Sequence, residues 1–212
     1  MIAYASRTGT KRNLAALRSA GWRLIVSAAA SLRHEGFPYA LDNGAWSYYQ
    51  RGLPFNEDAF AKALAKMGAA ADWVALPDIV GGGSASLALS LSWMDRVLNV
   101  ADRALIPVQD GMTANDVAPH VGLSRVGLFV GGTTAWKWST LPQWALLARQ
   151  SGCWLHVGRV NTRRRIVLCG ALGATSFDGT SASRYASTVP LLDWSRRQFS
   201  LALTLEELCP QG

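Results

Sequence analysis

The sequence predicts an α/β protein with the (β/α)8 TIM-barrel architecture, and three observations lead to that prediction. Eight short β-prone runs recur along the chain, most of them followed by a stretch with helical character. Several runs are almost continuously apolar, as parallel strands covered on their outer face require. The chain has 212 residues, which with eight strands favours a closed barrel, at the short end of the usual size, over an open doubly wound sheet. We therefore expect one compact TIM-barrel domain over residues 1–212.

The expected strands are short apolar runs, most of which stop beside Gly, Asp or Asn. They cover residues 2–6, 23–28, 39–42, 73–78, 104–109, 126–131, 154–158 and 174–178. Because a parallel strand reaches its neighbour through a crossover, we expect a helix in most of the intervening segments.

The expected helices cover residues 10–20, 56–71, 84–101, 113–121, 141–151 and 162–172, with a last helix from residue 193 closing the barrel. Segment 56–71 shows the signals most clearly: Asn56 is an N-cap candidate, Glu57 and Asp58 lie in the first turn, and Phe60 and Leu64 are apolar at helical spacing. Only the link between the second and third strands is too short for a helix.

Composition restricts the class of protein. Half of the residues are apolar and 17% are charged, which excludes a disordered chain. We find no run of 18 apolar residues and no signal-peptide pattern, so we expect a soluble, cytoplasmic protein. The cysteines, Cys153, Cys169 and Cys209, form no C-x-x-C pair. We expect reduced thiols, no structural zinc or other metal, and no cofactor.

The charge balance concerns the partner. The chain carries a formal net charge of +7 and nine tryptophans. An excess of Lys and Arg indicates a polyanion such as nucleic acid. Basic proteins without such a partner are common, and tryptophans mostly fill cores, so composition alone leaves both interpretations open.

The carboxyl ends of the expected strands are unusually polar. Asp42, Asp78, Gln109 and Asp178 each end or follow a strand, and in a barrel these ends form one mouth. Each motif alone fits an ordinary turn. Together they favour a site. Two close carboxylates suit chemistry at an anomeric carbon, one as nucleophile and one as proton carrier.

A second group of polar atoms suits recognition of a base. Asp78 and Gln109 offer acceptors and a donor for the edge of a purine-like base. The backbone N–H groups of Gly131 and Gly132 are candidates for binding its carbonyl oxygen. The pattern therefore indicates a base and a sugar in one pocket.

The order of these motifs resembles that of the tRNA-guanine transglycosylases. That family carries an Asp-Ser-Gly-Gly turn, a base-reading Asp, a Gln-Gly-Gly turn, a Gly-Gly loop, a strand ending in Gly, and a Phe-Asp segment followed by an Arg. The matching elements here are Asp42-Asn43-Gly44-Ala45-Trp46, Asp78, Gln109-Asp110-Gly111, Gly131-Gly132, Gly158, and Phe177-Asp178 with Arg184.

The resemblance implies a role for each matched residue. Asp178 is the expected nucleophile at C1′, and Asp42 handles the proton of the departing or incoming base. Arg184 is expected near the nucleophile and the nucleic-acid backbone. The expected base-binding residues are Asp78, Gln109, Gly131, Gly132 and Gly158.

The departures from the family are informative. Zinc-bearing members carry three cysteines and a histidine after the eighth strand, where this chain has only Cys209. The small, basic, zinc-free chain is most similar to the DpdA-type DNA-guanine transglycosylases of phages and bacteria. That likeness implies exchange of guanine in DNA for a 7-deazaguanine of the preQ0 type, in the cytoplasm of the host if the gene is carried by a phage. DNA is the expected partner, with tRNA as the alternative.

Extruding a nucleotide from a duplex calls for aromatic surfaces and phosphate contacts. The stacking candidates, on expected mouth loops, are Trp46 and Trp136. The phosphate candidates are Lys137, Arg159, Arg163, Arg164, Arg165 and Arg184. The run of three arginines also fits a solvated helix start.

Two further functions fit the same residues. A glycoside or nucleoside hydrolase would use Asp42 and Asp178 with water as the acceptor, leaving Asp78 and Gln109 unexplained. A non-catalytic nucleic-acid-binding barrel would use the acids only as turn residues.

Overall fold

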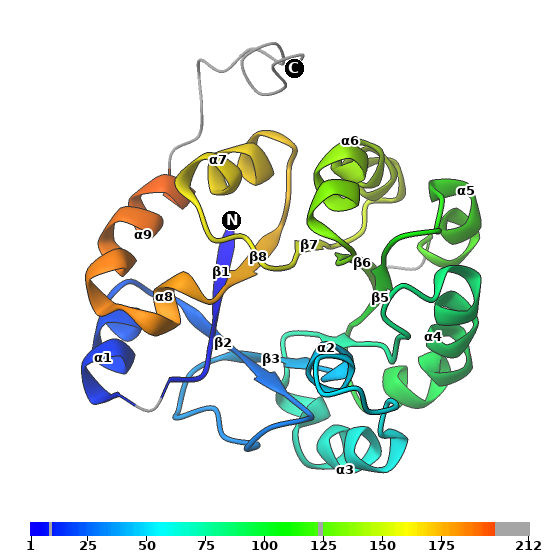
Figure 1. Ribbon diagram of the computed structural model, residues 1–212, viewed down its shortest axis with the longest axis horizontal. Coiled ribbons are helices and arrows are strands. Elements are labelled where there is room, and N and C mark those ends of the chain that lie inside the picture. The colour runs from blue at the N-terminus through cyan, green and yellow to red at the C-terminus, as the bar shows by residue number, and fades with distance from the viewer. Residues whose placement is uncertain (9, 123–124, 198–212) are drawn as a thin grey trace.

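The computed structural model describes residues 1–8, 10–122 and 125–197. Eight parallel strands close into a barrel in the order β1-β2-β3-β4-β5-β6-β7-β8, with helices arranged around it (Figure 1). The predicted (β/α)8 fold is confirmed. Cys209 lies outside the described residues. Among the helices that the structure describes, none combines the length and the apolar character needed to cross a membrane.

The strands agree closely with the expected runs. They are β1 (Ile2–Ser6), β2 (Arg23–Ser27), β3 (Tyr39–Asp42), β4 (Val74–Ala75), β5 (Ala104–Val108), β6 (Val126–Val130), β7 (Leu155–Val157) and β8 (Ser176–Gly179). The largest difference is β4, which has two residues where six were expected. Its run toward the mouth includes Pro77, which has no N–H to donate to a ladder.

The helices differ more from the prediction. They are α1 (Lys11–Ser19), α2 (Ala45–Tyr49), α3 (Glu57–Met67), α4 (Gly83–Leu98), α5 (Ala114–Val117), α6 (Thr134–Ser151), α7 (Arg163–Ala171), α8 (Ser181–Arg184) and α9 (Val189–Arg197). Three short 3-10 turns lie next to these helices: η1 (Gly68–Ala70), η2 (Ala118–His120) and η3 (Ala186–Thr188).

Two helix starts were predicted wrongly. Helix α6 begins at Thr134 rather than at residue 141, because the Thr133 side chain accepts the N–H of Trp136 as an N-cap and Pro142 is tolerated inside the helix. Helix α9 begins at Val189 rather than at residue 193, with Pro190 in its first turn, where the missing N–H costs nothing.

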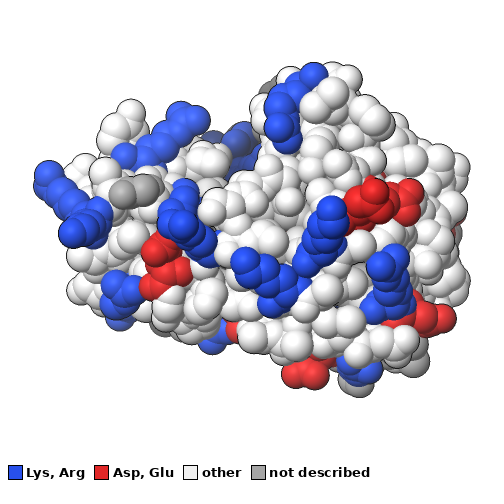
Figure 2. All heavy atoms as spheres, turned by 90° about the horizontal axis from the view of Figure 1, so that it is seen from below, with Lys and Arg blue, Asp and Glu red and all other residues white. Residues whose placement is uncertain are grey.

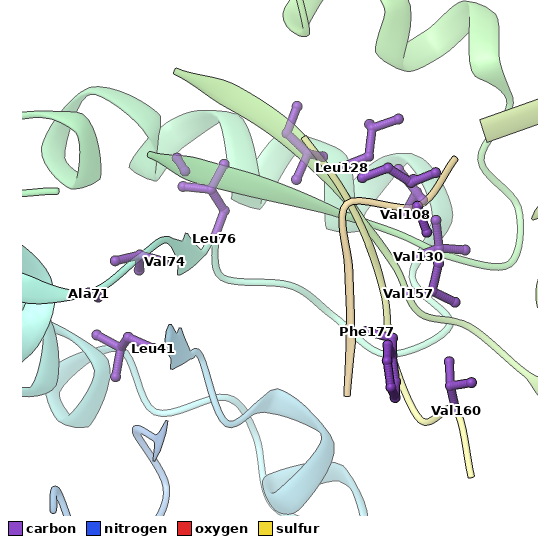
Figure 3. Close-up of a cluster of buried hydrophobic side chains, with 14 of the residues drawn as sticks. Leu41, Ala71, Val74, Leu76, Val108, Leu128, Val130, Val157, Val160 and Phe177 are labelled. Atoms are coloured by element: carbon purple, nitrogen blue, oxygen red, sulfur yellow. The ribbon is translucent and has the colours of Figure 1, made fainter. Parts of the chain in front are cut away.

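Side chains alternate between two sides of the barrel wall. Leu128 and Val130 point outward into the core that packs against the helices, whereas Phe129 between them faces the barrel interior. Figure 3 shows the outward cluster, with Leu76, Leu128, Val130 and other strand residues meeting between the sheet and the helices. The same alternation turns the inward positions of β3, β7 and β8 toward the barrel axis.

Candidate active site

A cavity of about 840 Å³ opens at the carboxyl ends of the strands. This size falls within the range of small-molecule sites, and the mouth of a barrel is where such sites form. Nine of the site residues predicted from the sequence line this cavity. They are Asp42, Trp46, Asp78, Gln109, Gly131, Gly132, Arg159, Asp178 and Arg184.

Asp178 is held on β8 with both carboxylate oxygens hydrogen-bonded. Nε2 of His156 lies 3.0 Å from Oδ2, and the backbone N–H of Arg159 donates to Oδ1 at 3.2 Å. The Asp178 side chain is 11% exposed, whereas His156 is fully buried. Two donors on an inward-facing carboxylate keep it oriented toward the cavity.

Asp42 ends β3, and its surroundings disfavour its charge. Burial, followed by repulsion from Asp178 and Asp78, raises the pKa of Asp42 to about 7. The N–H of Gly44 donates to Oδ2 at 3.0 Å and opposes this shift only in part. Asp42 can therefore hold or release a proton near neutral pH.

Gly44 is required by the backbone beside Asp42. Its φ is +83°, and an added Cβ would lie 2.7 Å from the Cβ of Ala29. Only glycine combines this left-handed conformation with so close an approach. The turn thereby directs a backbone N–H at the Asp42 carboxylate.

Asp78 and Gln109 contact each other rather than facing the cavity independently. Nε2 of Gln109 donates to Oδ2 of Asp78 at 2.9 Å and to Ser86 Oγ at 2.7 Å. Oε1 of Gln109 accepts the N–H of Gly81 at 2.6 Å. Both N–H donors of the amide are thus bound within the protein, and the contact with Asp78 gives Gln109 the role of orienting that carboxylate.

Asn43 supplies the second support of Asp78. Its Nδ2 donates to Oδ1 of Asp78 at 2.7 Å and to the carbonyl of Leu76 at 2.5 Å. Burial raises the pKa of Asp78 to about 6, against the hydrogen bonds from Asn43 and Gln109. The sequence interpretation missed this role, although Asn43 stands beside Asp42 in the same turn.

The glycine positions differ from their expected roles. The N–H of Gly131 donates to the carbonyl of Val108 at 2.9 Å, so it continues the sheet and is not free for a base carbonyl. Gly132 has a φ of +71°, and its carbonyl accepts the guanidinium of Arg159. Gly158 stands next to the nucleophile candidate: a Cβ there would lie 3.4 Å from Asp178 Oδ2.

One arginine spans the mouth. The guanidinium of Arg159 lies 4.4 Å above the ring of Trp46, which in turn stacks on Tyr49 at 5.6 Å. Arg159 also has a left-handed backbone, with φ of +58°, a strained conformation that often marks functional sites. The prediction that Trp46 and Arg159 belong to the mouth agrees with this geometry.

Lys137 does not reach the mouth as predicted. It lies on α6 rather than on a loop, is only 1% exposed, and its Nζ donates to the carbonyl of Gly158. Burial, followed by repulsion from Arg159, lowers the pKa of Lys137 to about 8. Lys137 supports the β7 loop from behind and is not a phosphate ligand.

Trp136 also belongs to α6, because that helix starts early. Its ring packs 6.0 Å from that of Trp144, and a Cβ on Gly132 would meet it at 2.6 Å. The ring of Trp136 therefore packs against Gly132 and Trp144 and is not a free stacking surface for a base.

The arginine run starts α7, behind Thr162, whose side chain caps the helix. Arg163 lies over the ring of Trp194 at 5.1 Å, Arg165 over Trp138 at 4.9 Å, and Arg164 is exposed. None of the three is part of the cavity lining.

Positive charge is spread over the molecule. Figure 2 shows one face on which Lys and Arg side chains lie in separate groups, with Asp and Glu between them. At the cavity itself the cationic residues are Arg7, Arg159 and Arg184. In the part of the chain that the structure describes, no three His, Cys, Asp or Glu side chains are grouped as metal ligands.

No family model and no curated protein matches the chain. Its fold is similar to solved structures. RipC from Yersinia pestis matches with a TM-score of 0.55 and 14% identity, over 99% of this chain and 98% of that one. Tryptophan synthase from M. tuberculosis, bound to aminoacrylate and BRD0059, matches with a TM-score of 0.54 and 14% identity, over 92% and 89%. At this identity the likeness concerns the fold alone, and the chemistry has to be argued from the site.

Proposed function

We propose that the protein is a DNA-guanine transglycosylase, which exchanges guanine in DNA for a 7-deazaguanine base of the preQ0 type. One observation carries the proposal. Asp42 and Asp178 line the same cavity in opposite environments, one hydrogen-bonded to two donors and the other disfavoured as an anion. Such a difference separates a nucleophile from a proton carrier.

The reaction then has two balanced steps. A carboxylate oxygen of Asp178 attacks C1′, the bond from C1′ to N9 of guanine breaks with its electron pair passing to the base, and Asp42 protonates that base. In the second step Asp42 takes the N9 proton of the incoming 7-deazaguanine, which attacks C1′ and releases Asp178. Two inversions retain the configuration of the sugar.

The cavity supports a flat, polar ligand. Asp78, held by Asn43 and Gln109, offers its remaining lone pairs to N–H donors of a purine-like base. Trp46 and Arg159 lie at the rim, where an extruded nucleotide would enter. The net charge of +7 favours a polynucleotide over a free nucleoside.

The test is incubation with guanine-containing DNA and labelled preQ0, with tRNA assayed in parallel. We expect label in DNA and a covalent protein–DNA adduct that Asp178→Asn abolishes while DNA affinity stays unchanged. The matched control is Asp110→Asn, a cavity carboxylate that bonds Thr133 and carries no proposed chemical role. Label in tRNA alone would reassign the substrate, and full activity of Asp178→Asn would refute the nucleophile.

A hydrolase is the second candidate, and one observation favours it. The amide of Gln109 is bound to Asp78, Ser86 and Gly81, so fewer groups read a base than exchange would use. Hydrolysis needs only Asp42, Asp178 and water. Release of free guanine without incorporation would establish this reaction, and binding without either product would indicate a non-catalytic barrel.

A further inference from the structure

A line of hydrogen bonds beneath the cavity ends at the carboxylate of Asp178. Nε1 of Trp154 lies 2.8 Å from Ser176 Oγ, and Ser176 Oγ lies 2.8 Å from Nδ1 of His156. Nε2 of His156 lies 3.0 Å from Oδ2 of Asp178. The register of β7 and β8, which pairs His156 with Ser176, places these groups in one continuous chain.

The chemistry of the groups gives this chain a direction. An indole N–H can only donate, so Ser176 Oγ accepts from Trp154 with one lone pair and can still donate its proton. The Asp178 carboxylate accepts from Nε2, which leaves Nδ1 of His156 as the acceptor for the serine proton. Nδ1 of His156 is then unprotonated, and the ring proton sits on Nε2, which donates to Asp178. The other neutral tautomer would set a bare nitrogen against a carboxylate oxygen.

The surroundings of His156 disfavour the doubly protonated ring. The side chain is fully buried, with the rings of Tyr4, Trp73 and Phe129 packed 5.8, 4.6 and 4.7 Å away. Burial lowers the pKa of His156, and the positive charge of Lys137 adds to this, against the attraction of Asp178. The ring is therefore a neutral donor at physiological pH.

We propose that His156 is a positioning residue, held in the Nε2–H tautomer by Trp154 and Ser176, which fixes the rotamer of Asp178 for attack at C1′. The role in attack rests on the proposed function, whereas the tautomer does not. A neutral donor orients the carboxylate, whereas a positively charged donor would also lower its nucleophilicity.

The tautomer is tested on the wild-type protein by NMR of the labelled histidine ring nitrogens. We expect one histidine with protonated Nε2 and bare Nδ1 at about pH 7.5, which lies above the usual histidine pKa of about 6.5, while His34 and His120 serve as internal references. In Ser176→Ala the Nδ1–H form gains population, and in the control Ser195→Ala, another buried serine, it does not. A protonated Nδ1 in the wild type at this pH overturns the proposal.

The positioning role is tested by the rate of adduct formation on guanine-containing DNA. We expect His156→Phe, which fills the aromatic cage without a donor, to lower this rate by about 10- to 100-fold at an unchanged KM. His156→Gln, whose amide N–H can replace Nε2–H, recovers most of the rate. Equal rates for the two variants overturn the role. A wild-type protein that forms no adduct instead refutes the proposed function, and the ring spectra then decide the tautomer alone.

Discussion

Replacing Asp42 by Asn is expected to stabilise the protein in a pH-dependent way. In the folded state the pKa of Asp42 is raised from 3.8 to about 7. Between these two values the folded chain holds a proton that the unfolded chain has lost. Stability of the wild type therefore falls as the pH rises through this window, and the loss is complete above the folded pKa.

The size of the effect follows from the shift. About three pKa units at 1.36 kcal/mol each amount to about 4 kcal/mol lost between pH 4 and pH 7. Asn resembles the protonated carboxyl, and its amide oxygen can still accept the N–H of Gly44. We expect Asp42→Asn to match the wild type near pH 4 and to exceed its stability by about 4 kcal/mol at pH 8.

Urea unfolding followed by tryptophan fluorescence, repeated from pH 4 to pH 8.5, measures this difference. The exposed Asp102 provides a matched control, since Asp102→Asn removes the same charge from the surface and should shift stability by less than about 0.5 kcal/mol. The same Asp42→Asn protein should lose base exchange. A stability curve that runs parallel to that of the wild type would show that burial and the neighbouring carboxylates do not raise the pKa of Asp42.

Three other changes have defined outcomes. Gly44→Ala should destabilise by about 2–4 kcal/mol in a thermal melt, because of its φ of +83° and the contact with Ala29, whereas Gly52→Ala, with nothing within 4 Å, should cost only about 1 kcal/mol. Relative to Lys137→Met, the wild type should gain stability as the pH rises from about 8, since the pKa of Lys137 is lowered to about 8 in the fold and the unfolded chain binds the extra proton; a difference between the two proteins that does not change with pH would contradict this. Arg184→Ala should weaken DNA binding equally for all sequences and reduce the salt slope by about 1 in a titration, and an unchanged slope would remove Arg184 from the phosphate contacts.

The barrel and the position of its acids were predictable because both follow from patterns within a few neighbouring residues. Apolar runs mark strands, and the alternation of side chains turns Asp42 and Asp178 inward once strand ends are known. Five of the six matched motifs line one cavity for that reason. Nothing in this step requires knowledge of contacts between strands.

The errors come from contacts that a linear pattern does not contain. The helix after the sixth strand was expected to start at residue 141, so Trp136 and Lys137 were assigned to a loop, yet the Thr133 cap starts α6 ahead of both. The N–H of Gly131 was counted as free, but the register of β5 with β6 commits it to Val108. In each case a group that binds another part of the protein was predicted to bind a ligand.

His156 was missed for a related reason. A histidine between Leu155 and Val157 is an inward position on a buried strand, and this alternation was the available signal. Its partner Ser176 follows only from the pairing of β7 with β8. A single polar residue at an inward position of a strand does not show whether it has a functional role. When a polar residue on the neighbouring strand is paired with it, the two predict a hydrogen-bond network.

The arrangement of the three carboxylates bears on how one cavity can serve both halves of an exchange reaction. Asp178 receives donors on both oxygens, one of them from a buried ring, so its orientation does not depend on the ligand. One turn contributes a donor to both other acids, the N–H of Gly44 to Asp42 and the amide of Asn43 to Asp78. In the proposed exchange, a bound base would lower the local dielectric around these acids, which would strengthen their repulsion and favour a proton on Asp42. If the protein carries out this exchange, binding of the departing base would favour the proton that its release requires, and transfer of that proton would prepare Asp42 to accept one from the base that enters.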